Sequence, residues 1–425
     1  MKKTAKETIG NQETSVWTEL VMPLAALMRG DLSALVHQLG LQAFGAMLEA
    51  ERTTLCGERY KHDRSRRATR GGTTRGELPF GGRLVTVARP RVVNRDGHDV
   101  PLSTWTELSS RDPLDARALE QMAIGVATRK YARSLESLSD GVEARGTSKS
   151  AVSRRFVALT TEKLVEWMSR PIAELDILAI FIDGIHFGDH VVLCALGVDA
   201  TGKKHVLGIW EGATENEIAC KAMLDNLVSR GLKPNRSRLF IIDGGKGLRT
   251  AIKSTFGRRA LVQRCQVHKL RNVLGHLPAE RHTDVRAAIR EAYTCTKVET
   301  AKRLLNNLAR ALQKKHPSAA ASLREGLDET LAVMGLGVSH ALTRTLATTN
   351  PVENLNDRIR TTARRVKRWD DGTMILRWVL VGVLEAERGF RRLKGYKDMP
   401  SLVARLKQHE HALAQTAVDP HKIAA

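Results

Sequence analysis

The spacing of apolar residues changes several times along the chain, and each change predicts a different kind of element. Between residues 17 and 55 apolar side chains recur at helical spacing, so we expect helices there, with breaks at Gly30 and Gly40. The segment "GRLVTVARPRVV" (residues 82–93) alternates instead, which predicts a strand with Pro90 at an edge. The basic segment 59–75 is expected to be a loop, because it contains glycines and threonines. The first part of the chain as a whole is expected to be mainly helical.

A second helical region contains a candidate DNA-binding motif. The segment "SLESLSDGVEARGTSKSAVSRRF" (residues 134–156) predicts a helix carrying Leu135 and Leu138, a turn at Gly146, and a second helix capped by Ser148. Two helices joined by a glycine-containing turn are the pattern of a helix-turn-helix, whose second helix reads the major groove of DNA.

Strand and helix patterns then alternate, which predicts an α/β fold. Three antiparallel strands, a helix, a strand, a helix and a strand follow one another, and this order is that of a ribonuclease H-like catalytic core. The strands are short β-branched runs bounded by turn residues. The expected elements are three strands within 177–210, a helix at 214–230, a strand ending at Asp243, a helix from Lys246 and a strand within 259–268.

The region after this core is helical again and is far longer than an ordinary connection of about 4–6 residues. We therefore predict an all-helical insertion into the core, followed by a helix in "TTNPVENLNDRIRTTARRVKRW". The expected organisation is an N-terminal helical and basic region (1–110), a helix-turn-helix region (111–170), the first part of the core (171–268), the insertion (269–346), and the last part of the core with the C-terminal helices (347–425).

The charge of the chain indicates what it binds. The 425 residues include 68 Lys and Arg against 46 Asp and Glu, a formal net charge of +22. Such a field attracts polyanions, and nucleic acid is the usual one. An anionic membrane surface is the competing partner, but no basic amphipathic helix with bulky apolar anchors stands out, so we expect no membrane binding.

The ends and the cysteines favour a cytoplasmic protein. No secretory signal is evident at the N-terminus, and no stretch approaches about 20 uninterrupted apolar residues. The five cysteines are scattered and odd in number, which fits reduced thiols better than a disulfide framework. A cytoplasmic, nucleoid-associated location follows.

Two aspartates carry the candidate chemistry. Asp183 and Asp243 each end a strongly apolar strand and precede glycine. One such residue would be taken for a turn residue, because Asp-Gly is a favoured turn pair. Two on neighbouring strands repel each other unless a cation lies between them, and hard cations such as Mg²⁺ prefer carboxylate oxygens. The pair therefore predicts a Mg²⁺ site.

A third carboxylate is expected, and two residues compete for the role. Glu353 is the first candidate, although it could instead complete a capping box with Asn350 as N-cap. Asp357, one turn further on, is the rival. A run of basic residues without an acid follows, which would suit a phosphodiester laid along the helix. Its members are Arg358, Arg360, Arg364, Arg365, Lys367 and Arg368.

Cys265 and His268 form another candidate site. A zinc ion would need two more ligands, and no second Cys/His pair is obvious in the sequence. His268 could lie near a scissile phosphate or be structural. The segment "DGGKGL" lacks the order of a nucleotide-binding phosphate loop, so triphosphate binding is not expected.

Taken together, these blocks resemble a known family. The segments "FIDGIHFGDH", "LGIWEGATEN", "DGGKGL", "RCQVHKLRNVL" and "TTNPVENLNDRIR" occur in the order seen in Mutator-type DDE transposases of bacterial insertion sequences. The resemblance covers roughly residues 124–368, with Asp183, Asp243 and Glu353 at the positions of the family's acidic triad. It also implies auxiliary roles near the site for Cys265, His268 and Arg360.

The resemblance implies a transposase with two Mg²⁺ ions, for which Mn²⁺ can substitute, held by the acidic triad. Such an enzyme binds the terminal inverted repeats of its element, cleaves the DNA 3′ end and transfers the strand, acting as a homo-oligomer, most simply a dimer. The residues expected to contact double-stranded DNA are Arg64, Arg66, Arg67, Arg70, Ser148, Lys149, Ser153, Arg154, Arg155, Arg358, Arg364, Arg365 and Lys367.

Two other functions are kept as alternatives. A non-catalytic DNA-binding descendant would retain the basic surface, but carboxylates in a DNA groove repel phosphate unless metal is used. A junction resolvase would explain the acids, but it would explain neither the helical insertion nor the N-terminal region.

Overall fold

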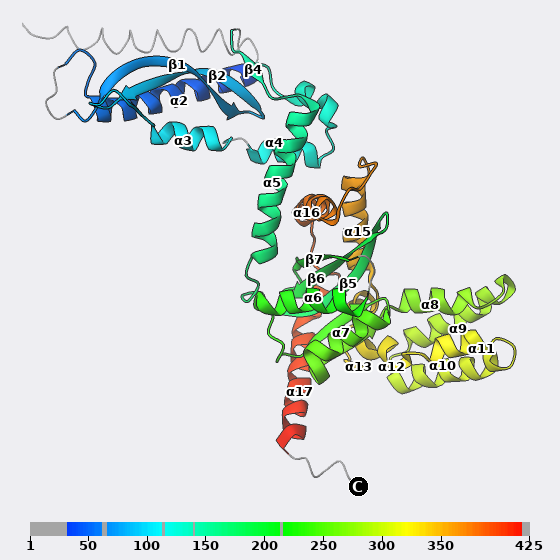
Figure 1. Ribbon diagram of the computed structural model, residues 1–425. Helices are drawn as coiled ribbons and strands as arrows, with labels where there is room; N and C mark the ends of the chain where they lie inside the picture. The colour runs from blue at the N-terminus through cyan, green and yellow to red at the C-terminus, as the bar shows by residue number, and fades with distance from the viewer. Residues whose placement is uncertain (1–31, 62–65, 113–114, 139–140, 213–215, 419–425) are drawn as a thin grey trace, which may run out of the picture. The chain divides into compact units, whose positions relative to one another are not determined.

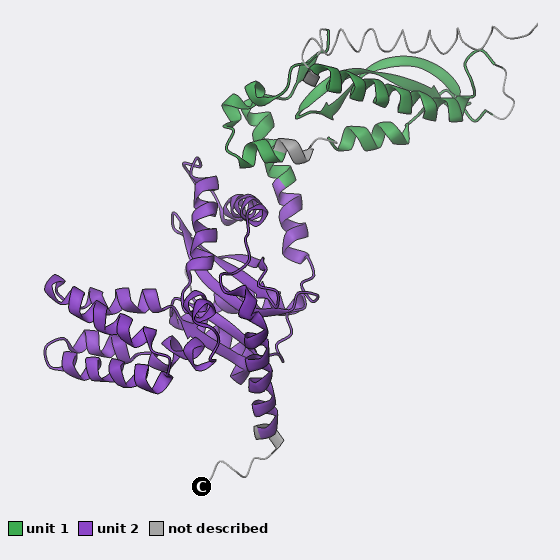
Figure 2. Ribbon diagram, turned by 180° about the vertical axis from the view of Figure 1, so that it is seen from behind, with its two compact units in different colours: residues 1–159 green, residues 160–425 purple. Residues whose placement is uncertain are grey.

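The computed structural model describes residues 32–61, 66–112, 115–138, 141–212 and 216–418. The chain divides into two compact units, residues 1–159 and residues 160–425, which Figure 2 colours separately. The long helix α5 (Lys149–Ser169) contributes residues to both units, since the division falls within it.

The first unit is built on helix α2 (Leu32–Cys56), which packs against a β-hairpin (Figure 1). The hairpin consists of β1 (Thr69–Phe80) and β2 (Arg83–Val93), and the short strands β3 (Asp99–Val100) and β4 (Ala144–Arg145) both pair with β2. Gly40 does not break α2 as expected. A Cβ there would meet the Phe80 ring at 2.5 Å, so the glycine gives the ring room against the helix. Gly30 lies outside the described residues.

The strand predicted at residues 82–93 is confirmed as β2, but its partner β1 was expected to be loop up to Arg75. The glycines and threonines of β1 hide the alternation of apolar and polar residues that would predict a strand. The strand nevertheless pairs with β2 along its length, with one shift of register between Arg70 and Thr73. Pro90 is not on an edge strand, because β2 pairs on both sides. On the side of β2 away from β1, β4 pairs with residues before Pro90 and β3 pairs with residues after it. Pro90 has no strand partner on that side, so its missing N–H is tolerated.

Helices α3 (Ser103–Ser110) and α4 (Asp115–Ala123) and the 3₁₀ helix η1 (Thr128–Ser134) complete the first unit before α5. The predicted first helix of the helix-turn-helix is wrong, because Leu135 and Leu138 follow η1 in irregular chain. A Cβ at Gly82 would meet the Leu135 side chain at 3.0 Å, so Leu135 packs on the hairpin turn instead. The second helix is confirmed: α5 begins at Lys149, and the Ser148 hydroxyl accepts from the Ala151 N–H at 3.3 Å.

The second unit contains a mixed sheet in the order β7-β6-β5-β8-β9. Strands β5 (Ile177–Phe187), β6 (His190–Asp199) and β7 (Lys204–Gly212) are antiparallel neighbours, whereas β8 (Arg238–Ile242) and β9 (Ala260–Arg264) run parallel to β5. Helices α6 (Glu217–Ser229) and α7 (Lys246–Phe256) connect the parallel strands. The predicted order of strands and helices is therefore found between residues 177 and 264.

Both faces of this sheet are covered, which explains why its strands are continuous apolar runs. Ile180 and Ile182 of β5 face a core shared with α6 and α7, whereas Phe181 and Ile185 face the opposite core. That second core includes residues of α15 (Asn350–Ala363), α16 (Gly372–Arg388) and α17 (Met399–Val418), which lie on this side of the sheet.

The described chain between β9 and α15 is mainly helical, as predicted (Figure 1). Its helices enclose a hydrophobic core of their own. The helices between β9 and α15 are α8 (Gln266–Gly275), α9 (His282–Thr294), α10 (Val298–Gln313), α11 (Pro317–Arg324), α12 (Leu327–Thr330), α13 (Ala332–Gly335) and α14 (His340–Leu346).

Among the described residues, no helix combines the length and the hydropathy that crossing a bilayer requires.

Candidate active site

The register of the parallel strands places Asp183 and Asp243 side by side. Ile182 of β5 pairs with Ile242 of β8, and each aspartate is the next residue on its strand. The Asp243 carboxylate accepts a hydrogen bond of 2.9 Å from the Gly245 N–H, which holds the turn after β8. Asp243 follows the end of β8, as expected, whereas Asp183 does not end β5, which continues beside β6 to Phe187. Asp183 instead follows the last residue of β5 that pairs with β8, so both carboxylates lie at the edge where this parallel pairing ends, and sites in open α/β sheets collect there.

Helix α15 brings Glu353 to this edge. Its N-cap is Thr349, one residue earlier than the expected Asn350, and no capping box forms. The Glu353 carboxylate instead accepts a hydrogen bond of 2.5 Å from the Thr349 hydroxyl. One turn further along, the Asn356 amide donates to Asp183 at 2.9 Å, so α15 carries one candidate carboxylate and contacts another.

The pKa of Asp183 shows how closely these acids meet. Burial raises it most, and the negative charges of Asp243 and then Glu353 raise it further, from 3.8 to about 6. The charges of Asp243 and Glu353 therefore act on Asp183 in a partly buried space. The rival Asp357 is different: its carboxylate pairs with Arg360 at 3.0 Å and is 71% exposed.

A second cluster adjoins Glu353. Cys265 follows β9 and is fully buried, and the Thr349 hydroxyl contacts both its Sγ and His268 Nδ1 at 3.3 Å. Burial opposes ionisation of Cys265, but hydrogen bonds with His268 and Thr349 outweigh it and lower the pKa of the thiol. The hydrogen bond with Cys265 is the main cause that raises the pKa of His268. The thiol of Cys265 and the imidazole of His268 are thus a hydrogen-bonded pair in which each shifts the pKa of the other.

Two residues of the site were not identified from the sequence. Thr349 and Asn356 are buried polar side chains, and each hydrogen-bonds to a candidate catalytic carboxylate. A buried polar residue inside a helical segment carries no periodic signal that distinguishes it from an exposed one. For Asn356, the only signal was its position on the same helix as Glu353.

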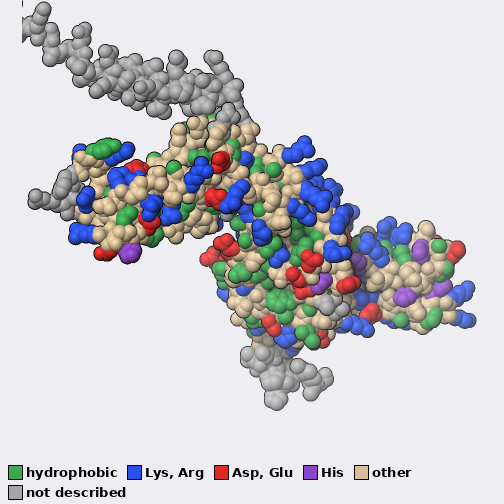
Figure 3. Space-filling model, turned by 45° about the horizontal axis from the view of Figure 1, so that its top comes forward, with side chains coloured by type: hydrophobic (Ala, Val, Ile, Leu, Met, Phe, Trp, Pro, Cys, Tyr) green, Lys and Arg blue, Asp and Glu red, His purple; other side chains and the backbone are tan. Residues whose placement is uncertain are grey.

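The basic residues after Glu353 lie on α15 and the loop that follows it. Arg358, Arg364, Arg365 and Lys367 are all exposed. Lys and Arg side chains are spread over both units on the face shown in Figure 3. The run after Glu353 therefore gives the second unit exposed positive charge on the helix that carries the candidate glutamate.

The candidate DNA-contacting residues of the first unit fall into two groups. Arg70 pairs with Glu49 and donates to the Thr53 hydroxyl at 3.0 Å, and Arg155 pairs with the buried Asp112, so both hold the fold together. Arg64 lies outside the described residues. The side chains that are exposed are those of Arg66, Arg67, Ser148, Lys149, Ser153 and Arg154.

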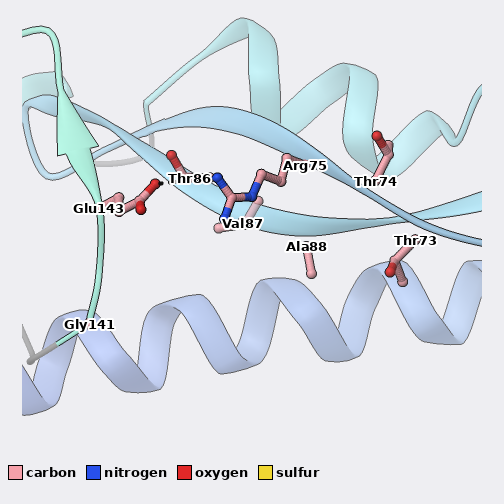
Figure 4. A pocket seen from close by; sticks show the side chains of 8 residues that line it. All are labelled: Thr73, Thr74, Arg75, Thr86, Val87, Ala88, Gly141 and Glu143. Carbon is pink, nitrogen blue, oxygen red and sulfur yellow. Dashed lines mark ion pairs between the residues drawn. The ribbon is translucent and has the colours of Figure 1, made fainter.

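A pocket of the first unit lies over the hairpin (Figure 4). Threonines of β1 and β2 line it, and Arg75 faces Glu143 across it at 4.0 Å. An exposed ion pair at this distance contributes little, and the pocket gathers no group of catalytic residues. The candidate chemistry therefore remains at the sheet edge of the second unit.

Comparison with known proteins shows the family of the chain. The family model "Transposase, Mutator family" matches residues 18–392. The chain is 28% identical over 332 residues, 75% of its length and 81% of the relative's, to the transposase for insertion sequence element IS256 in transposon Tn4001 of Staphylococcus aureus. It is 31% identical over 361 residues, 79% of its length and 86% of the relative's, to the transposase for IS406 of Burkholderia multivorans. The chain belongs to the Mutator family of transposases.

Proposed function

We propose that this chain is an insertion-sequence transposase that cuts and joins DNA with a DDE site made of Asp183, Asp243 and Glu353. The observation that carries the proposal is that Asp183 of β5, Asp243 after β8 and Glu353 near the start of α15 come together, so that burial and the charges of the other two carboxylates raise the pKa of Asp183. Separate structural roles would not require these acids to share one space. The order of the surrounding strands and helices supports a ribonuclease H-like core.

The three acids fit Mg²⁺ because they supply oxygen ligands and a concentration of negative charge that needs a counter-ion. Two bound Mg²⁺ ions would activate the attacking oxygen and stabilise the leaving 3′ oxygen of the DNA. Asn356 orients the Asp183 carboxylate, and Thr349 orients that of Glu353. Mn²⁺ should substitute for Mg²⁺, because it also accepts carboxylate ligands.

The substrate is double-stranded DNA in this proposal. The exposed basic run on α15 and in the loop after it would bind phosphates of the strand being cut. In the first unit, α5 begins with Lys149 and exposes Ser153 and Arg154, which would contact the inverted repeats at the ends of the element. Because the two ends must be brought together, we propose a homo-oligomer, most simply a dimer.

A cleavage assay tests the proposal. Purified full-length protein is mixed with end-labelled DNA carrying the terminus of the element, with Mg²⁺, with Mn²⁺ or with EDTA. We expect metal-dependent nicking at the 3′ end of the element and joined products when target DNA is added. Asp243→Asn should abolish both, by about 10²–10³-fold or more, while retaining the fold, since an amide oxygen still accepts from the Gly245 N–H.

The matched control is Asp189→Asn, which changes an exposed acid in the turn after β5. It should cut like the unaltered protein. Metal-dependent cutting that survives in Asp243→Asn would refute the assignment. Tight binding to the element's ends without cutting would favour the non-catalytic DNA-binding alternative, and cutting of branched DNA without strand transfer would favour a resolvase.

A further inference from the structure

Three side chains of different chemical types converge beside the carboxylate triad. A ligand atom of each of Cys265, His268 and Glu353, namely the thiol sulfur, a ring nitrogen and a carboxylate oxygen, lies within 4.8 Å of the others. The Thr349 hydroxyl contacts all three, at 3.3 Å from Sγ and Nδ1 and at 2.5 Å from the carboxylate. These side chains therefore face a common point.

The backbone holds this cluster in place. The Cys265 N–H donates to the Ile242 carbonyl at 2.7 Å, which fixes it to the end of β8. The next residue, Gln266, donates from its N–H to the Ala347 carbonyl at 2.9 Å, and the Thr349 N–H donates to the Cys265 sulfur at 3.4 Å. The start of α8 and the start of α15 are thus held together by hydrogen bonds. The three ligand atoms therefore lie within 4.8 Å of one another without a change of fold.

The chemistry of the cluster differs from that of the triad. Mg²⁺ takes oxygen ligands almost exclusively, whereas thiolate and imidazole favour softer ions. One sulfur, one nitrogen and one carboxylate oxygen are three ligands of a tetrahedral Zn²⁺ site with an open fourth position. The sequence did not predict zinc because it offered only the Cys265 and His268 pair; the third ligand comes from a distant helix.

We propose that Cys265, His268 and Glu353 form a binding site for Zn²⁺. Binding replaces the proton of the Cys265 thiol by the metal and releases that proton to solvent. The Thr349 hydroxyl remains as the hydrogen-bond donor that orients the Glu353 carboxylate, a role typical of the groups around a metal's ligands.

The shared residue gives the site a regulatory consequence. A Zn²⁺ ion that holds Glu353 removes this carboxylate from the pair Asp183 and Asp243, so Zn²⁺ should inhibit Mg²⁺-dependent cutting. This consequence rests on the proposed transposase function, whereas the binding of Zn²⁺ does not.

Cobalt provides the direct test, because Co²⁺ occupies zinc sites and shows a near-ultraviolet charge-transfer band when a thiolate binds it. Co²⁺ alone is titrated into metal-stripped full-length protein, without DNA. We expect one Co²⁺ per chain, the thiolate band, the intense visible bands of tetrahedral cobalt, and displacement of all of them by an equal amount of Zn²⁺.

Variants assign the ligands. Cys265→Ser should lose the thiolate band, whereas Cys295→Ser, at a free and less buried cysteine, should keep it. His268→Gln and Glu353→Gln should weaken Co²⁺ binding by about 10- to 100-fold or more. Their side chains are 26% and 31% exposed, so these changes keep the fold even if the buried Cys265 does not tolerate serine.

Absence of the thiolate band from the unaltered protein would overturn the proposal, and so would undiminished Co²⁺ affinity in both His268→Gln and Glu353→Gln. The two proposals fail separately. If Co²⁺ binds through the thiolate but Mg²⁺ never supports cutting, the zinc site stands and the transposase mechanism fails. If Mg²⁺ supports cutting and no thiolate band forms, the transposase mechanism stands and the zinc site fails.

Discussion

Ionisation of Asp183 lowers the stability of the folded protein. Because its pKa is raised from 3.8 to about 6, the folded state binds more protons than the unfolded state in this pH range. The contribution of Asp183 to the free energy of unfolding therefore falls as the pH rises from about 4 to about 6. Two pKa units correspond to about 3 kcal/mol, an upper value for a side chain that retains some contact with water.

Asp183→Asn should accordingly stabilise the metal-free protein at pH 7, by up to about 3 kcal/mol, while it abolishes cutting. Thermal unfolding in EDTA at pH 7 and at pH 4.5 measures this, and the gain should shrink at the lower pH. Adding Mg²⁺ should raise the melting temperature of the unaltered protein and leave that of Asp183→Asn unchanged. An equal gain from Asp189→Asn would show that general charge repulsion, and not the site, is the cause.

Asn356 gives a second prediction at this scale. Its amide donates to Asp183, and the residue is 1% exposed. Asn356→Ala removes the hydrogen bond that orients Asp183, so we expect cutting to fall by about 10- to 100-fold and the half-saturating Mg²⁺ concentration to rise. The control is Asn354→Ala, an exposed position on the same helix. Loss of stability without a change in Mg²⁺ dependence would show that Asn356 is merely structural.

Part of the candidate site could be predicted from single residues. Asp183 and Asp243 were found because each follows a buried apolar run, although only Asp243 ends its strand and β5 continues past Asp183 to Phe187. The order of strands also predicted that β5 and β8 are neighbours. The partners Thr349 and Asn356 were missed, because a hydrogen bond between residues so far apart in the chain depends on how α15 docks. The same docking converts the Cys265 and His268 pair into a three-ligand cluster.

At the scale of elements, the packing of α15 on α16 positions Glu353. A Cβ at Gly382 of α16 would meet the Ile359 backbone of α15 at 2.8 Å. Gly382→Ala should therefore push α15 away, destabilise the second unit by about 1–3 kcal/mol and reduce cutting. Gly45 in α2 has no atom within 4 Å of such a Cβ, so Gly45→Ala should stabilise the first unit by about 0.5–1 kcal/mol. Calorimetry measures whether each variant is less or more stable than the unaltered protein. A gain in stability at both positions would contradict the packing argument.

The elements themselves were predicted best where burial is complete. The strands of the second unit contain buried apolar runs because helices cover both faces, so their pattern survives in the sequence. The strand β1 was missed because much of it is exposed and it contains glycine, threonine and arginine. The first helix of the helix-turn-helix was wrong because Leu135 packs against the hairpin, a contact that helical spacing does not encode.

For the whole molecule, the net charge of +22 predicts DNA binding that weakens steeply with salt. Not every basic residue takes part in such binding. An arginine whose charge is already neutralised by a buried acid releases no counter-ion from DNA, so it adds to stability rather than to the salt dependence. Adjacent arginines in α5 separate these two roles.

Arg154 is exposed, whereas Arg155 pairs with Asp112, a fully buried carboxylate that also accepts from the Gly82 N–H at 2.9 Å. Arg154→Ala should lower the affinity for DNA of any sequence and reduce the slope of log affinity against log salt by about one, with little change in unfolding. Arg155→Ala should instead destabilise the first unit by about 3–5 kcal/mol, because it removes the positive charge that pairs with the buried Asp112 carboxylate. Salt-dependent binding and calorimetry on both variants measure these effects. An unchanged salt slope in Arg154→Ala would remove the start of α5 from the DNA interface, and the exposed basic residues after Glu353 would then have to account for it.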